Sequence, residues 1–308
     1  GTLLVNQSGR VLFGAGSSLS VGGSLEIRSG ASLRFENSSP ARVLTLLPGN
    51  TLAGSGTLQL DGGNRLVVPG DLDSTVGIWM NDSSRLVVPG MYIVRSSGSI
   101  SGTLQALGVV VQTNASLSAN NATLIIPAAG LVVASNASLT LNNATVSGAV
   151  EVQAGGQLLH TDGTVSYSTN VVVEAGATWS VNGTSTINLN GVLTNLGTLK
   201  WTSGYNIFTL QGSGRVENLG VWEIYHNYPA YGSFYESVVR VPVAVPLGGT
   251  LLVNQSGRVN FAAGSSLTMG GVLEVRSSGR LRLDNSSPAR DLTLLPGNTL
   301  AGSGILQL

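Results

Sequence analysis

Apolar residues recur in pairs separated by one residue along most of the chain, and polar turn-forming residues lie between the pairs. Four successive pairs near the N-terminus are Leu19/Val21, Leu25/Ile27, Leu33/Phe35 and Leu44/Leu46. A spacing of two places both side chains on one face of a β-strand, and the intervening Gly, Ser, Asn, Asp and Pro residues are typical of turns. The pattern therefore predicts many strands of about three to five residues and almost no helix.

A shorter repeat links these strands. The segment "NASLSANNAT" at 114–123 returns as "NASLTLNNAT" at 136–145, and "RLVVPG" at 65–70 returns at 85–90. A period of about 20–22 residues accommodates three short strands and three turns, which is one coil of a parallel β-helix. We therefore predict an all-β parallel β-helix (β-solenoid), with coils of about 20–22 residues and three short strands each. Asn136 should lie over Asn114, and Arg85 over Arg65.

A sandwich or an antiparallel barrel is the alternative for so many short strands. These folds usually show hairpin turns and one alternating face, and so regular a period is not expected of them. Predominantly antiparallel hairpins would favour this alternative over the β-solenoid.

A much longer repeat divides the chain. Residues 1–60 align without a gap with residues 249–308, and 47 of the 60 positions are identical. We predict that 1–248 is one full unit, with an irregular aromatic-rich segment at 221–240 and a seam at 241–248, and that 249–308 begins the next unit. At ~4.8 Å per coil, a unit of eleven or twelve coils would rise about 55 Å. Because both ends are plain repeat, we expect an interior piece of a longer rod.

The amino-acid composition limits the classes of partner and cofactor that the chain can bind. Charged residues make up 10% of the chain and the formal net charge is zero, against a usual charged fraction of about a quarter. A chain without net charge has no electrostatic field that would attract nucleic acid or an anionic membrane. No apolar run reaches the ~18 residues of a transmembrane helix. The absence of cysteine excludes a disulfide scaffold and thiolate metal sites. We predict no cofactor and no nucleic-acid partner.

Acidic residues cluster only once. Asp71 and Asp73 lie close together in "PGDLDSTVG", and Asp61 would lie near them on the adjoining coil. Polysaccharide-cleaving enzymes need clustered carboxylates, often with Ca²⁺ or a basic residue. We instead expect a solvated turn whose acids pair with Arg65 and Arg85, and predict no catalytic residue.

The two histidines, His160 and His226, are separated in sequence by three periods of the shorter repeat. They would therefore lie ~14 Å apart along one face, too far to share a metal ion. We expect both at the surface or in turns, and predict no metal site.

Asparagine occurs in ten Asn-x-Ser/Thr sequons. They are Asn6, Asn37, Asn81, Asn114, Asn121, Asn136, Asn143, Asn182, Asn254 and Asn285. One interpretation is N-glycosylation of an extracellular protein. The other is a ladder of stacked Asn amides that stabilises the turns from coil to coil, and this gains weight where sequons recur at the period of one coil. Both interpretations remain open.

One segment breaks the regular pattern. Six of the sixteen aromatic residues lie in "VWEIYHNYPAYGSFYESVVR" at 221–240, namely Trp222, Tyr225, Tyr228, Tyr231, Phe234 and Tyr235. Exposed Tyr and Trp often mark surfaces that bind sugars or proteins. We predict that this segment departs from the regular coil and supplies a lateral contact to a neighbouring chain or a glycan. Packing of these aromatics into the core is the alternative.

The spacing of apolar and turn-forming residues in "GSSLSVGGSLEIRSGASLRF" and "GLVVASNASLTLNNATVSGAVEVQAGG" resembles that in the β-helical stalks of large repetitive secreted adhesins. Filamentous-haemagglutinin-like proteins and autotransporter passengers are the families concerned. The resemblance covers nearly the whole chain apart from 221–240, and it carries no fixed catalytic residue. It implies an extracellular or cell-surface location and a role as an extended stalk or in attachment. A glycoprotein of a eukaryotic surface filament is a second interpretation.

These observations predict a non-enzymatic extracellular structural or adhesive rod, built from tandem 248-residue units and part of a long surface fibre. Further copies of the unit, end to end and side by side, are the expected partners, and glycans are a second class of candidate partner. The alternative is a carbohydrate-active enzyme or a sugar-binding module on a β-helix. A groove with convergent carboxylates and basic residues would favour that alternative.

Overall fold

The computed structural model describes residues 1–6, 9–13, 17–36, 40–203, 208–226, 236–254, 256–284 and 291–308. Within these ranges every regular element is a β-strand, and no helix occurs. The described residues accordingly contain no helix with the length and apolarity needed to cross a membrane. The chain forms two compact units, Gly1–Ala149 and Val150–Leu308. Strand pairing within each unit is parallel, which confirms the predicted parallel β-solenoid.

The first unit contains three stacks of strands, and each coil contributes one strand to each stack. One stack contains β2 (Arg10–Phe13), β5 (Ser32–Phe35), β8 (Thr57–Leu60), β13 (Ser116–Asn120) and β16 (Ser138–Asn142). A second contains β3 (Ser18–Val21), β6 (Val43–Leu46), β9 (Arg65–Val67), β14 (Thr123–Ile125) and β17 (Thr145–Ser147). The third contains β1 (Thr2–Val5), β4 (Ser24–Ile27), β7 (Thr51–Gly54), β10 (Leu72–Ser74) and β15 (Gly130–Val133).

Two strands of the first unit are far longer than the sequence predicts. β11 (Gly77–Val94) has 18 residues and β12 (Ser97–Val111) has 15. Each pairs successively with strands of all three stacks, so each of them passes two corners without a break in the strand assignment. Their mutual register shifts between Met80 and Ser84 and again between Val88 and Met91, which is where the corners lie.

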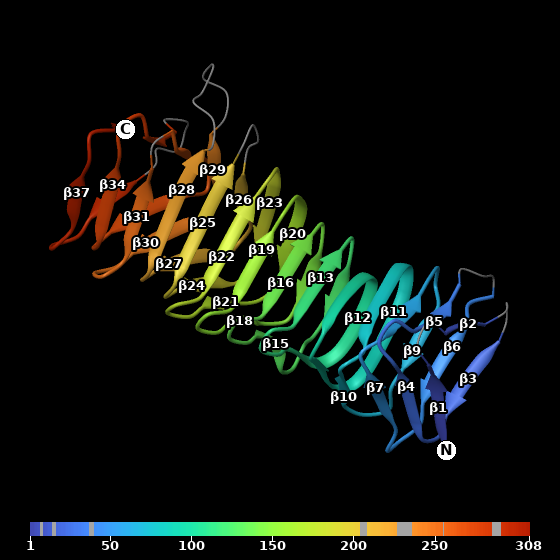
Figure 1. Ribbon diagram of the computed structural model, residues 1–308. Coiled ribbons are helices and arrows are strands. Elements are labelled where there is room, and N and C mark those ends of the chain that lie inside the picture. The colour runs from blue at the N-terminus through green and yellow to red at the C-terminus, as the bar shows by residue number, and fades with distance from the viewer. Residues whose placement is uncertain are drawn as a thin grey trace. The chain divides into compact units, whose positions relative to one another are not determined.

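The second unit repeats the same plan, and Figure 1 shows its strands side by side. One stack contains β18 (Val150–Val152), β21 (Val171–Val173), β24 (Val192–Asn195), β27 (Arg215–Asn218), β30 (Pro242–Val245), β33 (Ser266–Met269) and β36 (Leu292–Leu294). The next contains β19 (Gln157–His160), β22 (Thr178–Asn182), β25 (Thr198–Ser203), β28 (Val221–His226), β31 (Thr250–Val253), β34 (Val272–Val275) and β37 (Thr299–Ala301). The last contains β20 (Gly163–Tyr167), β23 (Ser185–Leu189), β26 (Thr209–Gln211), β29 (Ser237–Val239), β32 (Arg258–Phe261), β35 (Arg280–Leu283) and β38 (Ile305–Gln307).

Many coils have the predicted length. Ser116 pairs with Ser138, one predicted period further along the chain. The turns before these strands match, since Asn114 and Asn136 both have a positive φ, of 64° and 56°. Arg65 pairs with Arg85 as predicted.

The predicted coil length is wrong elsewhere. The step from Met91 to its partner Gly108 is shorter than one predicted period, whereas the step from Val221 to its partner Thr250 is longer. Longer coils carry their extra residues between strands, because the strands on either side keep their pairing.

The interior follows directly from the alternation in sequence. In β4, β5 and β8 the pattern of burial alternates, with every second side chain buried, and Leu25, Leu33 and Leu58 are fully buried. Each such side chain contributes about 2 kcal/mol through removal from water. The corners need glycine where coils approach closely: Gly54 has a φ of 109°, and any Cβ there would collide with the carbonyl oxygen of Ile27.

The two copies of the 60-residue repeat form the same set of strands. Thr2–Val5 corresponds to Thr250–Val253, and Ser32–Phe35 corresponds to Arg280–Leu283. Equivalent apolar positions are buried in both copies at Leu25 and Leu273 and at Leu33 and Leu281, whereas Leu294 and Leu300 on the last strands of the second copy are exposed. The division of the sequence into a 248-residue tandem repeat and the start of a second repeat is separate from the two compact units, and it remains a prediction.

Candidate functional site

Polar side chains form ladders from coil to coil. On the surface, Asn143 Nδ2 donates a hydrogen bond of 2.8 Å to Asn121 Oδ1. In the second unit Gln211 donates to Asn188, which in turn donates to Ser166, over 2.9 and 3.0 Å. Such ladders satisfy the outward amides of one coil with those of the next, which favours the amide-ladder interpretation for the sequons Asn121 and Asn143.

Other sequon residues also have defined contacts. Asn81 Nδ2 donates to Asp61 over 2.7 Å, Asn254 Nδ2 donates to Glu223 over 2.7 Å, and Asn6 Oδ1 accepts from Arg28 over 3.5 Å. At Asn81, Asn143 and Asn254, the nitrogen that would carry a glycan is therefore already a donor.

The remaining described sequons, Asn114, Asn136 and Asn182, are exposed. A positive φ at Asn114 and Asn136 is itself a reason for asparagine, which tolerates this conformation better than most residues. The predicted sequons Asn37 and Asn285 lie outside the described residues. Glycosylation of any sequon remains a prediction.

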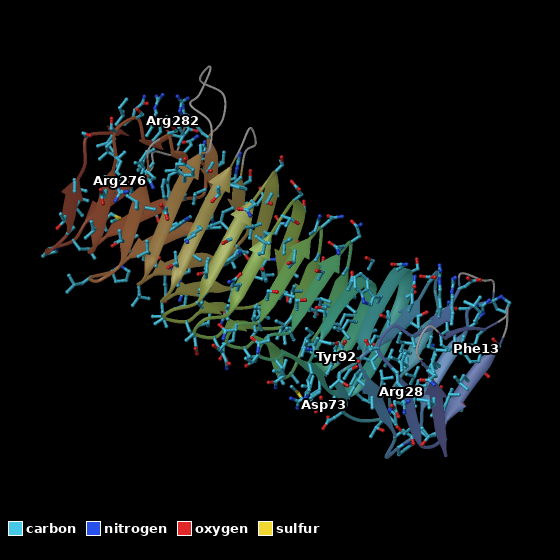
Figure 2. All side chains as sticks on the ribbon, viewed as in Figure 1. Phe13, Arg28, Asp73, Tyr92, Arg276 and Arg282 are labelled. Atoms are coloured by element: carbon cyan, nitrogen blue, oxygen red, sulfur yellow. The ribbon has the colours of Figure 1, made fainter. Side chains whose placement is uncertain are left out.

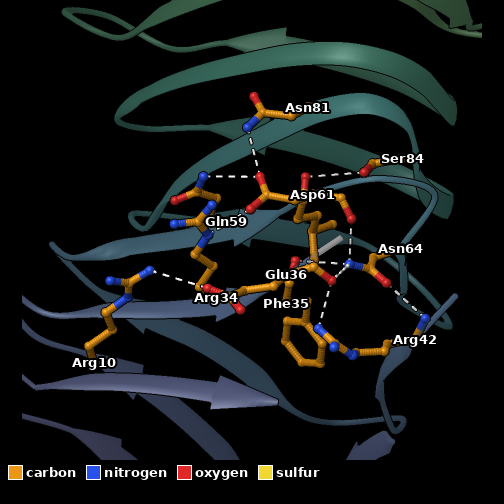
Figure 3. Close-up of polar contacts among 11 residues, drawn as sticks. Arg10, Arg34, Phe35, Glu36, Arg42, Gln59, Asp61, Asn64, Asn81 and Ser84 are labelled. Atoms are coloured by element: carbon orange, nitrogen blue, oxygen red, sulfur yellow. Dashed lines mark hydrogen bonds and ion pairs between the residues drawn. The ribbon is translucent and has the colours of Figure 1, made fainter. Parts of the chain in front are cut away.

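Asp61 lies at the centre of a polar cluster in the first unit (Figure 3). Its buried carboxylate accepts hydrogen bonds from Arg34 Nε at 2.6 Å, Gln59 Nε2 at 3.0 Å and Asn81 Nδ2 at 2.7 Å. Three donors, two of them from neighbouring coils, compensate for the burial of this charge. The arrangement is that of a structural anchor.

Asn64 extends the same cluster into the interior. Its side chain is fully buried; Oδ1 accepts from the backbone nitrogen of Arg42 at 2.8 Å, and Nδ2 donates to the carbonyl oxygens of Phe35 and Glu36 at 2.8 and 2.9 Å. Arg42 also donates to the carbonyl oxygen of Glu36 over 2.6 Å. Asn64 thus ties Glu36 and Arg42 to the following coil.

The predicted partners of the acidic turn are wrong. Asp73 forms a two-pronged ion pair with Arg95, at 2.5 and 2.8 Å, and Asp71 accepts a 2.8 Å hydrogen bond from the backbone nitrogen of Met91. The parallel register explains this choice, because Asp73 pairs with Ile93 in the next coil and Arg95 follows two positions later on the same face. Asp61 has the separate partners described above.

The expectation that the histidines lie at the surface is also wrong. His160 is fully buried, its Nε2 lies 2.6 Å from the hydroxyl of Tyr167, and its ring meets Trp179 edge-on with centroids 5.1 Å apart. Burial lowers the pKa of His160 from 6.5 to about 3. For His226, burial and then the charge of Arg258 lower the pKa to about 4. Both histidines occupy inward positions of their strands and are therefore core residues.

The described residues include no group of three or more His, Asp or Glu side chains that could hold a metal ion.

The aromatic segment divides between core and surface. Trp222, proposed above as a lateral contact, is fully buried and meets Trp201 edge-on with centroids 4.7 Å apart, so its ring stabilises the interior. Its strand, β28, alternates inward Trp222 and Ile224 with outward Tyr225. Tyr225 is 37% exposed and remains available for contact. The predicted contacts Tyr228, Tyr231, Phe234 and Tyr235 lie outside the described residues.

A groove lies on the outer side of β25 and β28. Lys200, Trp201, Thr202, Glu223, Tyr225 and Asn254 line a cavity of about 230 Å³, which we call the Glu223 groove. Arg276 donates to Asn254 over 3.3 Å and to Glu274 over 2.8 Å beside it, and Figure 2 labels Arg276 together with Arg282 of β35. Neither Lys200 nor Glu223 was expected from the sequence to belong to a site. Two signals were available: Lys200 is the sole lysine, and Glu223 lies within the aromatic segment.

No protein-family model and no curated protein matches the chain. Among solved structures, the chain is similar to the crystal structure of the TibC-catalyzed hyper-glycosylated TibA55-350 fragment. The identity is 14%, the alignment covers 100% of both chains, and the TM-score is 0.29. At this level the likeness carries no argument about function, and the fold assignment stands on the strand pairing described above.

Proposed function

We propose that the chain is a non-enzymatic, extracellular structural or adhesive protein, built from tandem 248-residue β-solenoid units. The observation that carries the proposal is the near-identical 60-residue repeat, with 47 identical positions, both copies of which form the same strands. Tandem repetition of a folded segment extends a solenoid without any new chemistry, because each coil needs only its neighbours for burial and pairing.

The surface chemistry fits a scaffold. Outward Asn, Gln and Ser side chains bond to the same positions of the next coil, so each added coil satisfies polar groups as well as backbone groups. The formal net charge of zero and the charged fraction of 10% leave little repulsion between copies. We therefore propose end-to-end and lateral self-association within a surface fibre.

The location and the glycans can be tested together on native material. We expect antibodies against the chain to label intact, unpermeabilised cells, and mild protease treatment of those cells to remove the label. The intact mass before and after enzymatic deglycosylation then separates a glycoprotein from an amide-ladder protein. Labelling only after permeabilisation would contradict the extracellular location, whatever the mass measurement gives.

A sugar-binding module is the second candidate, and the Glu223 groove is the observation that favours it. The groove combines an exposed tyrosine with a lysine, a glutamate and an asparagine.

A further inference from the structure

Two outward rows of side chains define the Glu223 groove. Lys200 and Glu223 are register partners on β25 and β28, as are Thr202 and Tyr225. Asn254 lies on the next coil at the end of β31, where its backbone nitrogen bonds to the carbonyl oxygen of Ile224 over 2.9 Å. Successive coils place such side chains ~4.8 Å apart, so the groove spans three coils and is lined by both polar and aromatic groups.

Lys200 and Glu223 are not joined to each other, although they are neighbours in register. None of the ion pairs in the described part of the chain includes Lys200. The Glu223 carboxylate instead accepts the 2.7 Å hydrogen bond from Asn254, and its other oxygen can still accept. The cavity therefore lies between an ammonium donor and a carboxylate acceptor.

A buried aromatic pair fixes the strand beneath the groove, and an exposed aromatic residue forms one wall. Trp201 is buried and packs edge-on against Trp222, so the backbone that carries Lys200 and Thr202 is anchored in the core. Tyr225, the register partner of Thr202, is 37% exposed. Its ring offers an apolar face and a polar hydroxyl, the combination found where one side of a ligand is apolar and the other is wet.

We propose that the Glu223 groove binds one ring of a neutral oligosaccharide. A sugar ring presents an apolar face of C–H groups that can pack on Tyr225, and hydroxyls that both donate and accept. Glu223 would accept from one hydroxyl, and Lys200 would donate to another. The opposite charges of Lys200 and Glu223 balance, and Arg276 beside the groove is neutralised by its ion pair with Glu274, which favours an uncharged ligand over an anionic one. At about 230 Å³ the cavity is smaller than the ~300–1,000 Å³ of sites for drug-sized ligands.

So small a site predicts weak binding by a single groove. A higher overall affinity through many identical grooves would depend on the proposed tandem arrangement. Binding by a single groove does not depend on it. The experiment below therefore measures the single groove, and its outcome is independent of whether fibres form.

Isothermal titration calorimetry of the full 308-residue chain tests the proposal. The probes are cellohexaose, laminarihexaose, mannohexaose and chitohexaose, with a heparin hexasaccharide as the anionic comparison. We expect at least one neutral hexasaccharide to bind, and Tyr225→Ala to raise its Kd about tenfold through loss of the stacking contact. Glu223→Gln, which keeps size but removes the charge, should also weaken binding. Both variants should keep the wild-type circular dichroism.

Trp79→Ala is the matched control, because Trp79 is another exposed aromatic, 47% exposed, on β11; it should leave the Kd unchanged. Absence of binding by every neutral probe at about 10 mM would overturn the proposal. Preference for the heparin hexasaccharide would overturn it too, since an anionic ligand would be bound by arginines such as Arg276 and not by the groove, whose charges balance. Equal affinity of the wild type, Tyr225→Ala and Glu223→Gln would place the sugar elsewhere and would likewise overturn it.

Discussion

Asn195 and Asn218 lie one above the other inside the solenoid, and Asn195 Nδ2 donates a 2.6 Å hydrogen bond to Asn218 Oδ1. Both side chains are fully buried. Asn218 Nδ2 continues the chain of bonds to the carbonyl oxygen of Thr250 at 2.8 Å, and Asn195 Oδ1 accepts from the backbone nitrogen of Gly197 at 3.2 Å. Three coils are thus joined by side-chain amides in addition to their strand pairing.

Asn218→Ala should destabilise the second unit. It leaves the amide of Asn195 and the carbonyl oxygen of Thr250 without this partner, at a cost of about 1–3 kcal/mol for each group that stays buried and unsatisfied. Urea unfolding followed by circular dichroism measures the loss. Asn143→Ala is the control, because it removes an amide from the exposed ladder to Asn121, where water can replace it. Equal effects of the two substitutions would contradict the structural role assigned to the buried ladder.

Trp222 and Tyr225, which both lie on β28, should respond in opposite ways. Trp222→Ala removes a fully buried ring that packs on Trp201 and should cost about 3–5 kcal/mol. Tyr225→Ala removes a part-exposed ring and should cost less than about 1 kcal/mol. Thermal unfolding of the two variants provides the comparison. A Trp222→Ala protein as stable as the wild type would return this residue to the surface role first predicted from sequence.

His160 should make stability depend on pH. Burial lowers its pKa from 6.5 in the unfolded chain to about 3 in the folded protein, so only the unfolded chain takes up a proton as the pH falls from 6.5. The free energy of unfolding should therefore fall with decreasing pH, by roughly 2 kcal/mol between about pH 7 and 5 from this residue. The decline should continue until the pH reaches the folded pKa.

His160→Gln should remove this part of the pH dependence while it keeps a polar partner for the Tyr167 hydroxyl. His226→Gln should remove a second part, because the pKa of His226 is lowered to about 4. Urea midpoints at about pH 7, 6 and 5 measure the effect above the range in which exposed carboxylates titrate. The same pH dependence in the wild type and in His160→Gln would show that this residue does not titrate on unfolding.

Asp61 and Asp73 of the first unit should differ in how much they contribute to the free energy of unfolding. Asp61→Ala removes a buried carboxylate and leaves Arg34, Gln59 and Asn81 without their common acceptor, with an expected loss of about 3 kcal/mol. Asp73→Ala removes an exposed pair with Arg95, for which less than about 1 kcal/mol is expected. Chemical denaturation of both variants at low and high salt measures the difference. A larger effect at Asp73 would contradict the assignment of Asp61 as the anchor.

The alternation of apolar residues and the short period of the repeat were sufficient to predict the fold class, the parallel pairing and the register of Arg65 with Arg85. Those features depend on local geometry that every coil repeats. The lengths of the irregular coils could not be predicted, because the number of residues between two strands leaves the pairing of the strands themselves unchanged. The continuous paths of β11 and β12 likewise depend on corners, where the sequence pattern carries no period.

The errors at His160 and Trp222 have a common cause. Both residues were judged by their type, whereas their place in the strand decides the direction of the side chain. His160 lies two positions after the buried Leu158, and Trp222 two before the buried Ile224. The same spacing rule that identified the strands would have placed both side chains inside. The Glu223 groove was missed for a different reason, because its residues come from three coils of unequal length.

Electron microscopy of the native material tests the central claim most directly, that tandem 248-residue units form a structural fibre. Long fibres with an axial repeat of about 55 Å are expected, which is the rise of one unit at ~4.8 Å per coil. A compact, monodisperse particle of about the 31.4 kDa of this chain would contradict it.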